Sequence, residues 1–137
     1  MADVTTTWSG GLRFLHASGS GHLCVTDAPI VPAGPTTAPT PMEFVLHALA
    51  GCAGVDVVAI LTKMQQPLTG LEIGVTAERA ESHPRIYTKI HLEFRVRGAV
   101  DERKLQRALE LSHEHYCSVA AMLRGTTALS YTYVLQG

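Results

Sequence analysis

The sequence predicts an α+β fold. Three short strand-like segments come first, a long apolar helix follows, and two alternating strands, a second helix and a final strand complete the chain. Strands and helices that do not alternate regularly indicate an α+β domain rather than a doubly wound one. The 137 residues match the size of one domain, so we expect a single domain over residues 1–137. A hydrophobic content of 46% is enough to bury a core.

The first third of the chain is predicted to form short strands over residues 4–8, 12–16 and 22–26. Gly10-Gly11 separates the first two strands, and the Ser-Gly-Ser-Gly segment 18–21 separates the second from the third. Glycine and serine clusters of this kind are typical of turns. Residues 28–41 contain five of the seven prolines, so we expect a loop there rather than a domain boundary.

Residues 42–64 are predicted to form a helix that is buried nearly all round, because sixteen of its 23 residues are apolar. Thr40 can cap this helix, and Pro41 suits its first turn. At about 100° per residue, Cys52 and Asp56 share one face, while Glu43 and two glycines lie opposite. Both faces are therefore expected to be covered. The helix is not expected to span a membrane, because three charged residues interrupt it: Glu43, Asp56 and Lys63.

Residues 71–79 and 86–97 alternate between apolar and polar side chains, and the six-residue link between them predicts an antiparallel pair. In the second of these strands Ile86, Ile90 and Phe94 are expected to face the core and Tyr87 to face solvent. Asp101 is expected to cap a second helix, whose pattern runs to Gly125 with a break near Cys117. Residues 127–135 then form the last strand, with Leu129, Tyr131, Tyr133 and Leu135 on one face.

The charge balance excludes some partners. Eleven basic and twelve acidic residues give a net charge of −1, so neither a nucleic acid nor an anionic membrane is an expected partner. The N-terminal segment has no basic region followed by an apolar one, so we expect a cytoplasmic location. In a reducing compartment the three cysteines should be thiols rather than structural disulfides. The sequence contains no phosphate-binding loop and no dinucleotide fingerprint, and no cofactor is expected.

Three residues of the two helices could carry chemistry. Cys52 lies one turn before Asp56 in the apolar helix, and Cys117 lies near the end of the second helix. Both cysteines could be small core residues, or they could meet as a reactive thiolate and its resolving thiol. Asp56 needs a partner, which could be a backbone group, a structural arginine, or an arginine that Asp56 orients at Cys52. Cys24 is expected to be structural.

A metal site is the competing use of the same groups. His113 and Cys117 are four residues apart on the second helix, with His115 between them. The spacing lacks the paired motifs typical of zinc sites, so no metal is expected.

Three runs of the sequence resemble the osmotically-inducible-protein-C/organic-hydroperoxide-resistance family (OsmC/Ohr), and within it the YhfA-like branch. They are PMEFVLHALAGCAGVDVVAIL (41–61), ERAESHPRIYTKIHLEFRVRG (78–98) and HEHYCSVAAML (113–123). The resemblance implies an OsmC-like fold, in which antiparallel sheets wrap around two central helices in an intertwined homodimer. It also implies active sites at the subunit interface.

The resemblance implies a role for particular residues. The reactive cysteine of the family falls on Cys52, the resolving cysteine on Cys117, and the arginine that stabilises the thiolate on Arg13. The chain departs from the family pattern where Met42 replaces a glutamate and where Ser118 replaces a proline. Glu43 is one residue on from the family's glutamate and points away from Cys52, so no glutamate is assigned to the site.

The resulting prediction is a thiol-dependent peroxidase that reduces organic hydroperoxides in oxidative-stress defence, with an external dithiol as reductant. Cys52 attacks the peroxide, Cys117 closes a disulfide, and Arg13, with Asp56, supports the Cys52 thiolate. The alternative is a non-catalytic dimeric module that binds a small lipophilic molecule, with the cysteines as packing or redox-sensing groups.

Overall fold

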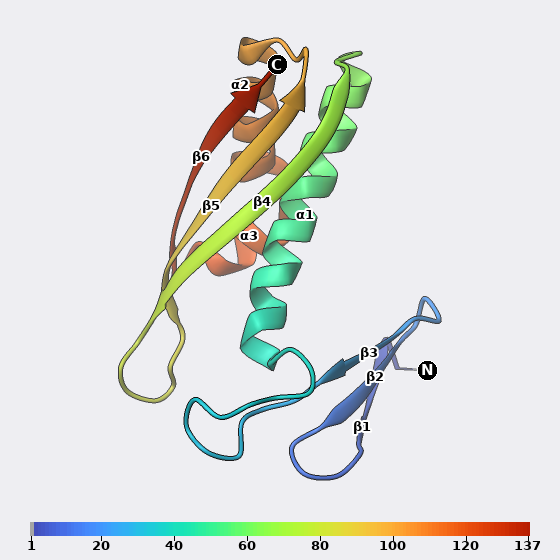
Figure 1. Ribbon diagram of the computed structural model, residues 1–137, viewed down its shortest axis with the longest axis vertical. Helices are drawn as coiled ribbons and strands as arrows, with labels where there is room; N and C mark the ends of the chain where they lie inside the picture. Colours follow the sequence, from blue (N-terminus) through green and yellow to red (C-terminus); the bar gives the residue numbers. More distant parts are fainter. Residues whose placement is uncertain (1) are drawn as a thin grey trace. The chain divides into compact units, whose positions relative to one another are not determined.

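The computed structural model describes residues 2–137, which form two compact units (Figure 1). The N-terminal unit ends at His47, and the C-terminal unit spans Ala48–Gly137. Each unit is described by itself below.

The N-terminal unit contains a three-stranded antiparallel sheet in the order β1-β2-β3. The strands are β1 (Val4–Trp8), β2 (Phe14–Ser18) and β3 (Leu23–Thr26). The second strand begins two residues later than expected, because the turn before it is longer. Gly10 and Gly11 both have positive φ angles, and the Arg13 amide donates to the Gly10 carbonyl. Arg13 therefore ends the turn instead of belonging to the strand.

Helix α1 (Pro41–Lys63) begins where the sequence predicts. The Glu43 amide donates to Thr40 Oγ1 at 3.2 Å, and the Thr40 amide donates to Glu43 Oε1 at 2.9 Å. This reciprocal pair is a capping box, which satisfies two of the free amides at the helix start. Glu43 thus has a structural role in capping the helix.

One stripe of α1 is buried within the C-terminal unit. Its members recur every four residues, namely Leu49, Ala53, Val57 and Leu61. By length and composition alone α1 could cross a membrane. A stripe buried against protein is typical of a core helix in a globular domain.

The C-terminal unit contains a second three-stranded sheet, in the order β4-β5-β6. Its strands are β4 (Leu68–Arg79), β5 (Tyr87–Gly98) and β6 (Ala128–Gln136). Figure 1 shows α1 and α2 (Glu102–Leu111) on the same side of this sheet. The buried residues of β5 form the sheet's side of the core, namely Ile90, Leu92, Phe94 and Val96.

The expectation that both sheets are antiparallel is wrong for β6. Strands β4 and β5 are antiparallel, as predicted, but β6 runs parallel to β5. Between them the chain passes through α2, a π-helical turn η1 (Ser112–Tyr116) and α3 (Ser118–Leu123). A helical crossover of this length returns the chain to the end of the sheet where β5 began, so the next strand pairs in parallel.

The predicted orientation of the first residues of β5 is also wrong. Tyr87 is buried and Ile86 is 43% exposed, the reverse of the expected alternation. Glu78 pairs with Lys89 but Arg79 pairs with Tyr87, so β5 carries one extra residue at this point. Such a bulge reverses the faces of the residues beyond it. Thr88, expected to face the core, is exposed as well, and the residues from Lys89 to Arg97 alternate as predicted.

The second helix breaks at the position that the sequence indicates. Asp101 caps α2 by accepting a hydrogen bond from the Lys104 amide at 3.0 Å. The π-helical turn η1 closes when the Cys117 amide donates to the Ser112 carbonyl at 2.8 Å. Cys117 is extended, with φ −74° and ψ 102°, and caps α3 by accepting a hydrogen bond from the Ala120 amide at 3.4 Å. Cys117 is therefore held at a joint between two helical segments.

Candidate functional site

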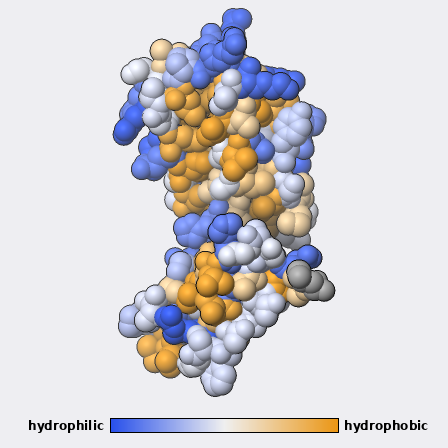
Figure 2. All heavy atoms as spheres, turned by 90° about the vertical axis from the view of Figure 1, so that its right-hand side faces the viewer, coloured by the Kyte–Doolittle hydropathy of each residue, from blue (hydrophilic) through white to orange (hydrophobic). Residues whose placement is uncertain are grey.

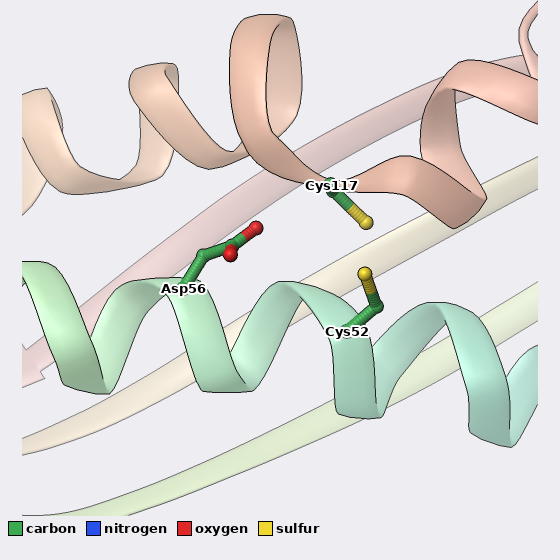
Figure 3. A group of neighbouring side chains, drawn as sticks. All are labelled: Cys52, Asp56 and Cys117. Carbon is green, nitrogen blue, oxygen red and sulfur yellow. The ribbon is translucent and has the colours of Figure 1, made fainter.

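Cys52, Asp56 and Cys117 come together in the C-terminal unit. The two sulfurs and a carboxylate oxygen of Asp56 all lie within 4.8 Å of one another. Figure 3 shows the sulfurs of Cys52 and Cys117 turned toward each other and the Asp56 carboxylate beside them. Both cysteines are free thiols. The contact joins residues that are 65 positions apart in the chain.

Two elements position these side chains. Cys52 and Asp56 are four residues apart on α1 and therefore share a face of the helix. Cys117 comes from the joint between η1 and α3. Cys52 and Asp56 are half-buried, whereas Cys117 is only 3% exposed. Of the two thiols, Cys52 is the more exposed to solvent.

The hydrogen-bond partner of Asp56 is Ser112. The Ser112 hydroxyl is buried and donates to Asp56 Oδ2 at 2.9 Å. Ser112 is not among the site residues that the sequence predicts. The available signal was a serine on the apolar face of the second helix, because a buried hydroxyl needs a hydrogen-bond partner, but that signal does not name the partner.

The surroundings of Cys117 favour its protonated form. Burial, with smaller effects of the neighbouring Cys52 and Asp56, raises the pKa of the Cys117 thiol to about 11, against the opposing effect of the Ala120 amide. Cys117 is therefore a neutral thiol near pH 7. A neutral thiol is a poor first nucleophile, because the thiolate is the reactive species.

His113 and Tyr131 lie close to Cys117 around a small cavity. Their ring centroids are 5.1 Å apart, and Arg124 donates a hydrogen bond to the His113 carbonyl. Burial, and next the positive charge of Arg124, lower the pKa of His113, so its ring is neutral near pH 7. The cavity between these residues and α1 measures about 10 Å³ and has room for one water.

The histidines of the predicted metal alternative do not join Cys117. The ring of His113 packs on Tyr131, and His115 is exposed on η1. Among residues 2–137, the group whose atoms could share a metal ion with Cys117 consists of Cys52 and Asp56. Cys24 is exposed on β3 and is not part of this group.

Arg13 belongs to the N-terminal unit, and its role at Cys52 stays a prediction. Its guanidinium donates a hydrogen bond to the Thr37 hydroxyl, and that hydroxyl donates to Asp27 Oδ2 at 2.9 Å. The Thr37 and Ala28 amides also donate to the Asp27 carboxylate, each at 2.8 Å. These hydrogen bonds, the Thr37 amide first, lower the pKa of Asp27. Asp27 is a buried anion near Arg13 that the sequence pattern does not reveal.

A groove begins beside Asp56 in the C-terminal unit. Its volume is about 490 Å³, and it lies between the second half of α1 and the end of α2 with η1. It is lined by Asp56, Ala59, Ile60, Lys63, Met64, Leu111 and Tyr116. The walls are mostly apolar, with the Lys63 ammonium as the one basic group among them.

Comparison with known proteins places the chain in one family. The sequence profile of the OsmC-like protein family matches residues 34–132, which include all three residues of the cluster. This chain belongs to the OsmC-like protein family. The match covers all of α1, strands β4 and β5, the helical segments that follow them, and the first residues of β6.

Relatives of this OsmC-like protein include Protein YhfA of Escherichia coli strain K12, at 42% identity over 92% of each chain. A hypothetical protein from Aquifex aeolicus VF5 has a similar solved structure, with 29% identity and a TM-score of 0.84 over 100% of this chain and 98% of its own. The organic hydroperoxide resistance protein OhrB of Bacillus subtilis shares the fold, with 21% identity and a TM-score of 0.64 over 98% of each chain. The α+β fold with two three-stranded sheets is therefore that of the OsmC-like proteins.

Proposed function

We propose that this OsmC-like protein is a thiol-dependent peroxidase that reduces organic hydroperoxides. The observation that carries the proposal is the contact between Cys52 and Cys117, whose sulfurs lie within 4.8 Å. A disulfide needs the sulfurs about 2.05 Å apart, a distance that small side-chain movements can reach from here. The name of the related OhrB, an organic hydroperoxide resistance protein, points to the same substrate class.

The reaction begins with Cys52 as a thiolate. Its sulfur attacks the terminal oxygen of the hydroperoxide, a sulfur–oxygen bond forms, the oxygen–oxygen bond breaks, and the alcohol leaves after taking up a proton. Cys52 is then a sulfenic acid. The Cys117 sulfur attacks the Cys52 sulfur, the sulfur–oxygen bond breaks, and water leaves as the disulfide forms. An external dithiol reduces the disulfide by thiol–disulfide exchange and is itself oxidised to a disulfide.

The environments of the two cysteines support this division of roles. Cys52 is the more accessible thiol, and Cys117 is buried with a raised pKa. Cys117 must lose its proton when it attacks, and the Asp56 carboxylate is close enough to receive that proton. Asp56 by itself disfavours a thiolate, because like charges repel. We therefore assign Asp56 to the resolving step and keep Arg13 as the proposed cation at Cys52.

The substrate would approach through the apolar groove beside Asp56. A volume of about 490 Å³ falls within the range of small-molecule sites and exceeds what a molecule as small as hydrogen peroxide needs. Its apolar walls favour a substrate with a hydrocarbon group. Bulky organic hydroperoxides should therefore be better substrates than hydrogen peroxide.

We further propose that two copies of the chain form the intertwined homodimer that the family resemblance implies. One face of α1 is exposed although it is apolar, with Val55 69% and Val58 42% exposed. Figure 2 shows hydrophobic side chains gathered on the side of the C-terminal unit toward which α1 lies in Figure 1. An apolar face of this kind is typical of a covered interface. The location remains the cytoplasmic one expected from the sequence, with neither nucleic acid nor membrane as a partner.

Hydroperoxide consumption tests the proposed function. Purified protein with dithiothreitol should consume tert-butyl hydroperoxide, and Cys52→Ser should lower the rate by at least about 10²-fold, since a hydroxyl at an ordinary pKa is not an effective nucleophile here. Cys24→Ser is the matched control and should keep the full rate, because Cys24 is exposed on another sheet. Normal consumption by Cys52→Ser would show that the proposed nucleophile is wrong.

The non-catalytic alternative uses the same groove. An apolar groove that begins at Asp56, whose carboxylate lies next to the two free thiols, could hold a small lipophilic molecule without chemistry. This function predicts that a ligand remains bound through purification and that the protein does not turn over hydroperoxide repeatedly with dithiothreitol present. Repeated turnover that depends on Cys52 excludes it.

A further inference from the structure

We propose that the reduced cluster of Cys52, Asp56 and Cys117 is also a binding site for a divalent cation of the zinc type, and that metal binding and disulfide formation exclude each other. The site itself follows from the geometry of the three side chains. The effect on peroxide reduction rests on the proposed function.

The geometry of the three donor atoms fits one small ion. Ligand atoms bonded to a tetrahedral zinc ion at about 2.0–2.3 Å lie about 3.5–3.8 Å from one another. The two sulfurs and the Asp56 oxygen already lie within 4.8 Å of one another. Each side chain therefore needs to move by about 1 Å or less to complete the coordination.

The chemistry of the donors selects the class of ion. Two cysteine sulfurs favour soft or borderline cations, and a carboxylate is an additional zinc ligand. Magnesium and calcium require oxygen ligands and would not use the sulfurs. Three protein ligands leave a fourth position open to water or another small ligand, and the half-buried Cys52 and Asp56 give that position access to solvent.

Groups around the cluster are placed to support bound metal. The buried Ser112 hydroxyl donates to Asp56 Oδ2 at 2.9 Å, which fixes one carboxylate oxygen and leaves the other free to bind. The Ala120 amide donates to the Cys117 sulfur at 3.4 Å, an interaction that also stabilises a thiolate. These contacts orient two of the three ligands before any ion arrives.

Metal binding and redox chemistry compete for the same sulfur electron pairs. A Cys52 thiolate bonded to zinc is a weaker nucleophile toward peroxide, and a Cys52–Cys117 disulfide has no thiolates to offer a metal. The ion would act as a reversible inhibitor of the reduced protein. When the protein is reduced and a zinc-type ion is present, the metal-bound form would be an inactive resting state. A chelator that removes the ion would restore the active protein.

Cobalt(II) titration of the full-length reduced protein under nitrogen tests the site, because tetrahedral cobalt bound by thiolates absorbs strongly in the near ultraviolet. We expect one cobalt per chain, thiolate-to-cobalt absorption, and displacement by zinc. Cys52→Ser should weaken binding at least about tenfold and remove about half of this absorption. Asp56→Asn keeps both thiols, so it should weaken binding about tenfold and retain the absorption. Cys24→Ser is the control and should titrate like the wild type.

Two results would overturn the site. One is cobalt binding without thiolate absorption in the wild type. The other is titration of Cys52→Ser with the affinity and spectrum of the wild type.

The same preparations separate this inference from the proposed function. In a single turnover without dithiothreitol, which itself binds zinc, one equivalent of zinc should slow the reaction of the reduced protein with hydroperoxide at least about tenfold, and excess chelator should restore the rate. If the wild type consumes hydroperoxide at the full rate but does not bind cobalt, the proposed metal site is wrong and the peroxidase function stands. If the wild type binds cobalt but Cys52→Ser consumes hydroperoxide normally, the proposed peroxidase mechanism is wrong and the metal site stands. An unchanged rate with one zinc bound would contradict the competition.

Discussion

Cys117 is the residue whose surroundings say most about the reaction. It is buried, it caps α3 through its sulfur, and it lies against Cys52 and Asp56. Burial and the neighbouring Cys52 and Asp56 disfavour the Cys117 thiolate, whereas the Ala120 amide that Cys117 caps favours it. A thiol of this kind suits the second step of a peroxidase, in which it attacks a sulfenic acid that already lies beside it.

The raised pKa of Cys117 predicts how stability changes with pH. The thiol has a pKa of about 11 in the folded protein against an ordinary value of 9.0. The folded state therefore holds this proton more tightly than the unfolded state, and its contribution is complete below pH 9. The free energy of unfolding should fall as the pH rises from 9 to 11. Urea unfolding should show a smaller fall in Cys117→Ala than in the wild type.

A different result would contradict this account of Cys117. If the wild type and Cys117→Ala lose stability equally between pH 9 and 11, the thiol does not have a raised pKa. Comparison of the two proteins is needed because tyrosine and lysine side chains also titrate in this range.

At the residue scale the sequence predicts the chemistry of single groups better than their partners. Cys52, Asp56 and Cys117 are recognisable by residue type and by the family resemblance. Ser112 is not, because a serine on the apolar face of a helix has no pattern that names its partner 56 residues away. The hydrogen bond exists only because α1 and η1 pack together.

Helix α1 is the element that joins the site to the proposed dimer. One stripe, from Leu49 to Leu61, is buried in the C-terminal unit, and Cys52 and Asp56 project toward η1. A third face carries Val55 and Val58, which are exposed in the single chain. Gly51 on the same helix has nothing within 4 Å of where a Cβ would lie. This third face is free to receive a second copy.

A charge on that third face should break the dimer. Val55→Glu would bury an unpaired carboxylate in the proposed interface, so the dissociation constant should rise by at least about tenfold, which corresponds to about 1.4 kcal/mol. Sedimentation equilibrium of the two proteins measures this change. Thr69→Glu places the same charge at an exposed position on β4 and should leave the dimer intact. A wild type that sediments as a monomer, or an unchanged constant in Val55→Glu, would contradict the interface.

At the element scale most boundaries follow from the sequence, and the errors have non-local causes. Apolar alternation located β4 and β5, and capping residues located the starts of α1 and α2. The burial of Tyr87 depends on a bulge opposite Glu78 and Arg79, which a single strand's pattern does not show. The parallel pairing of β6 depends on the path of the whole crossover.

For the whole molecule, membership of the OsmC-like family and the α+β fold agree with the two three-stranded sheets. The family resemblance was visible in the three quoted runs, but no pattern in them fixed the distance between the sulfurs. That distance depends on how α1 packs against the joint between η1 and α3. The central claim is that this packing serves a reaction between Cys52 and Cys117.

The most direct test of that claim is mass spectrometry of the full-length reduced protein after one equivalent of tert-butyl hydroperoxide. Digestion without reductant should yield the Cys52 and Cys117 peptides linked together, with the mass of two hydrogens lost and the Cys24 thiol unchanged. A Cys52 peptide that carries sulfinic acid, or both peptides with free thiols, would contradict the account.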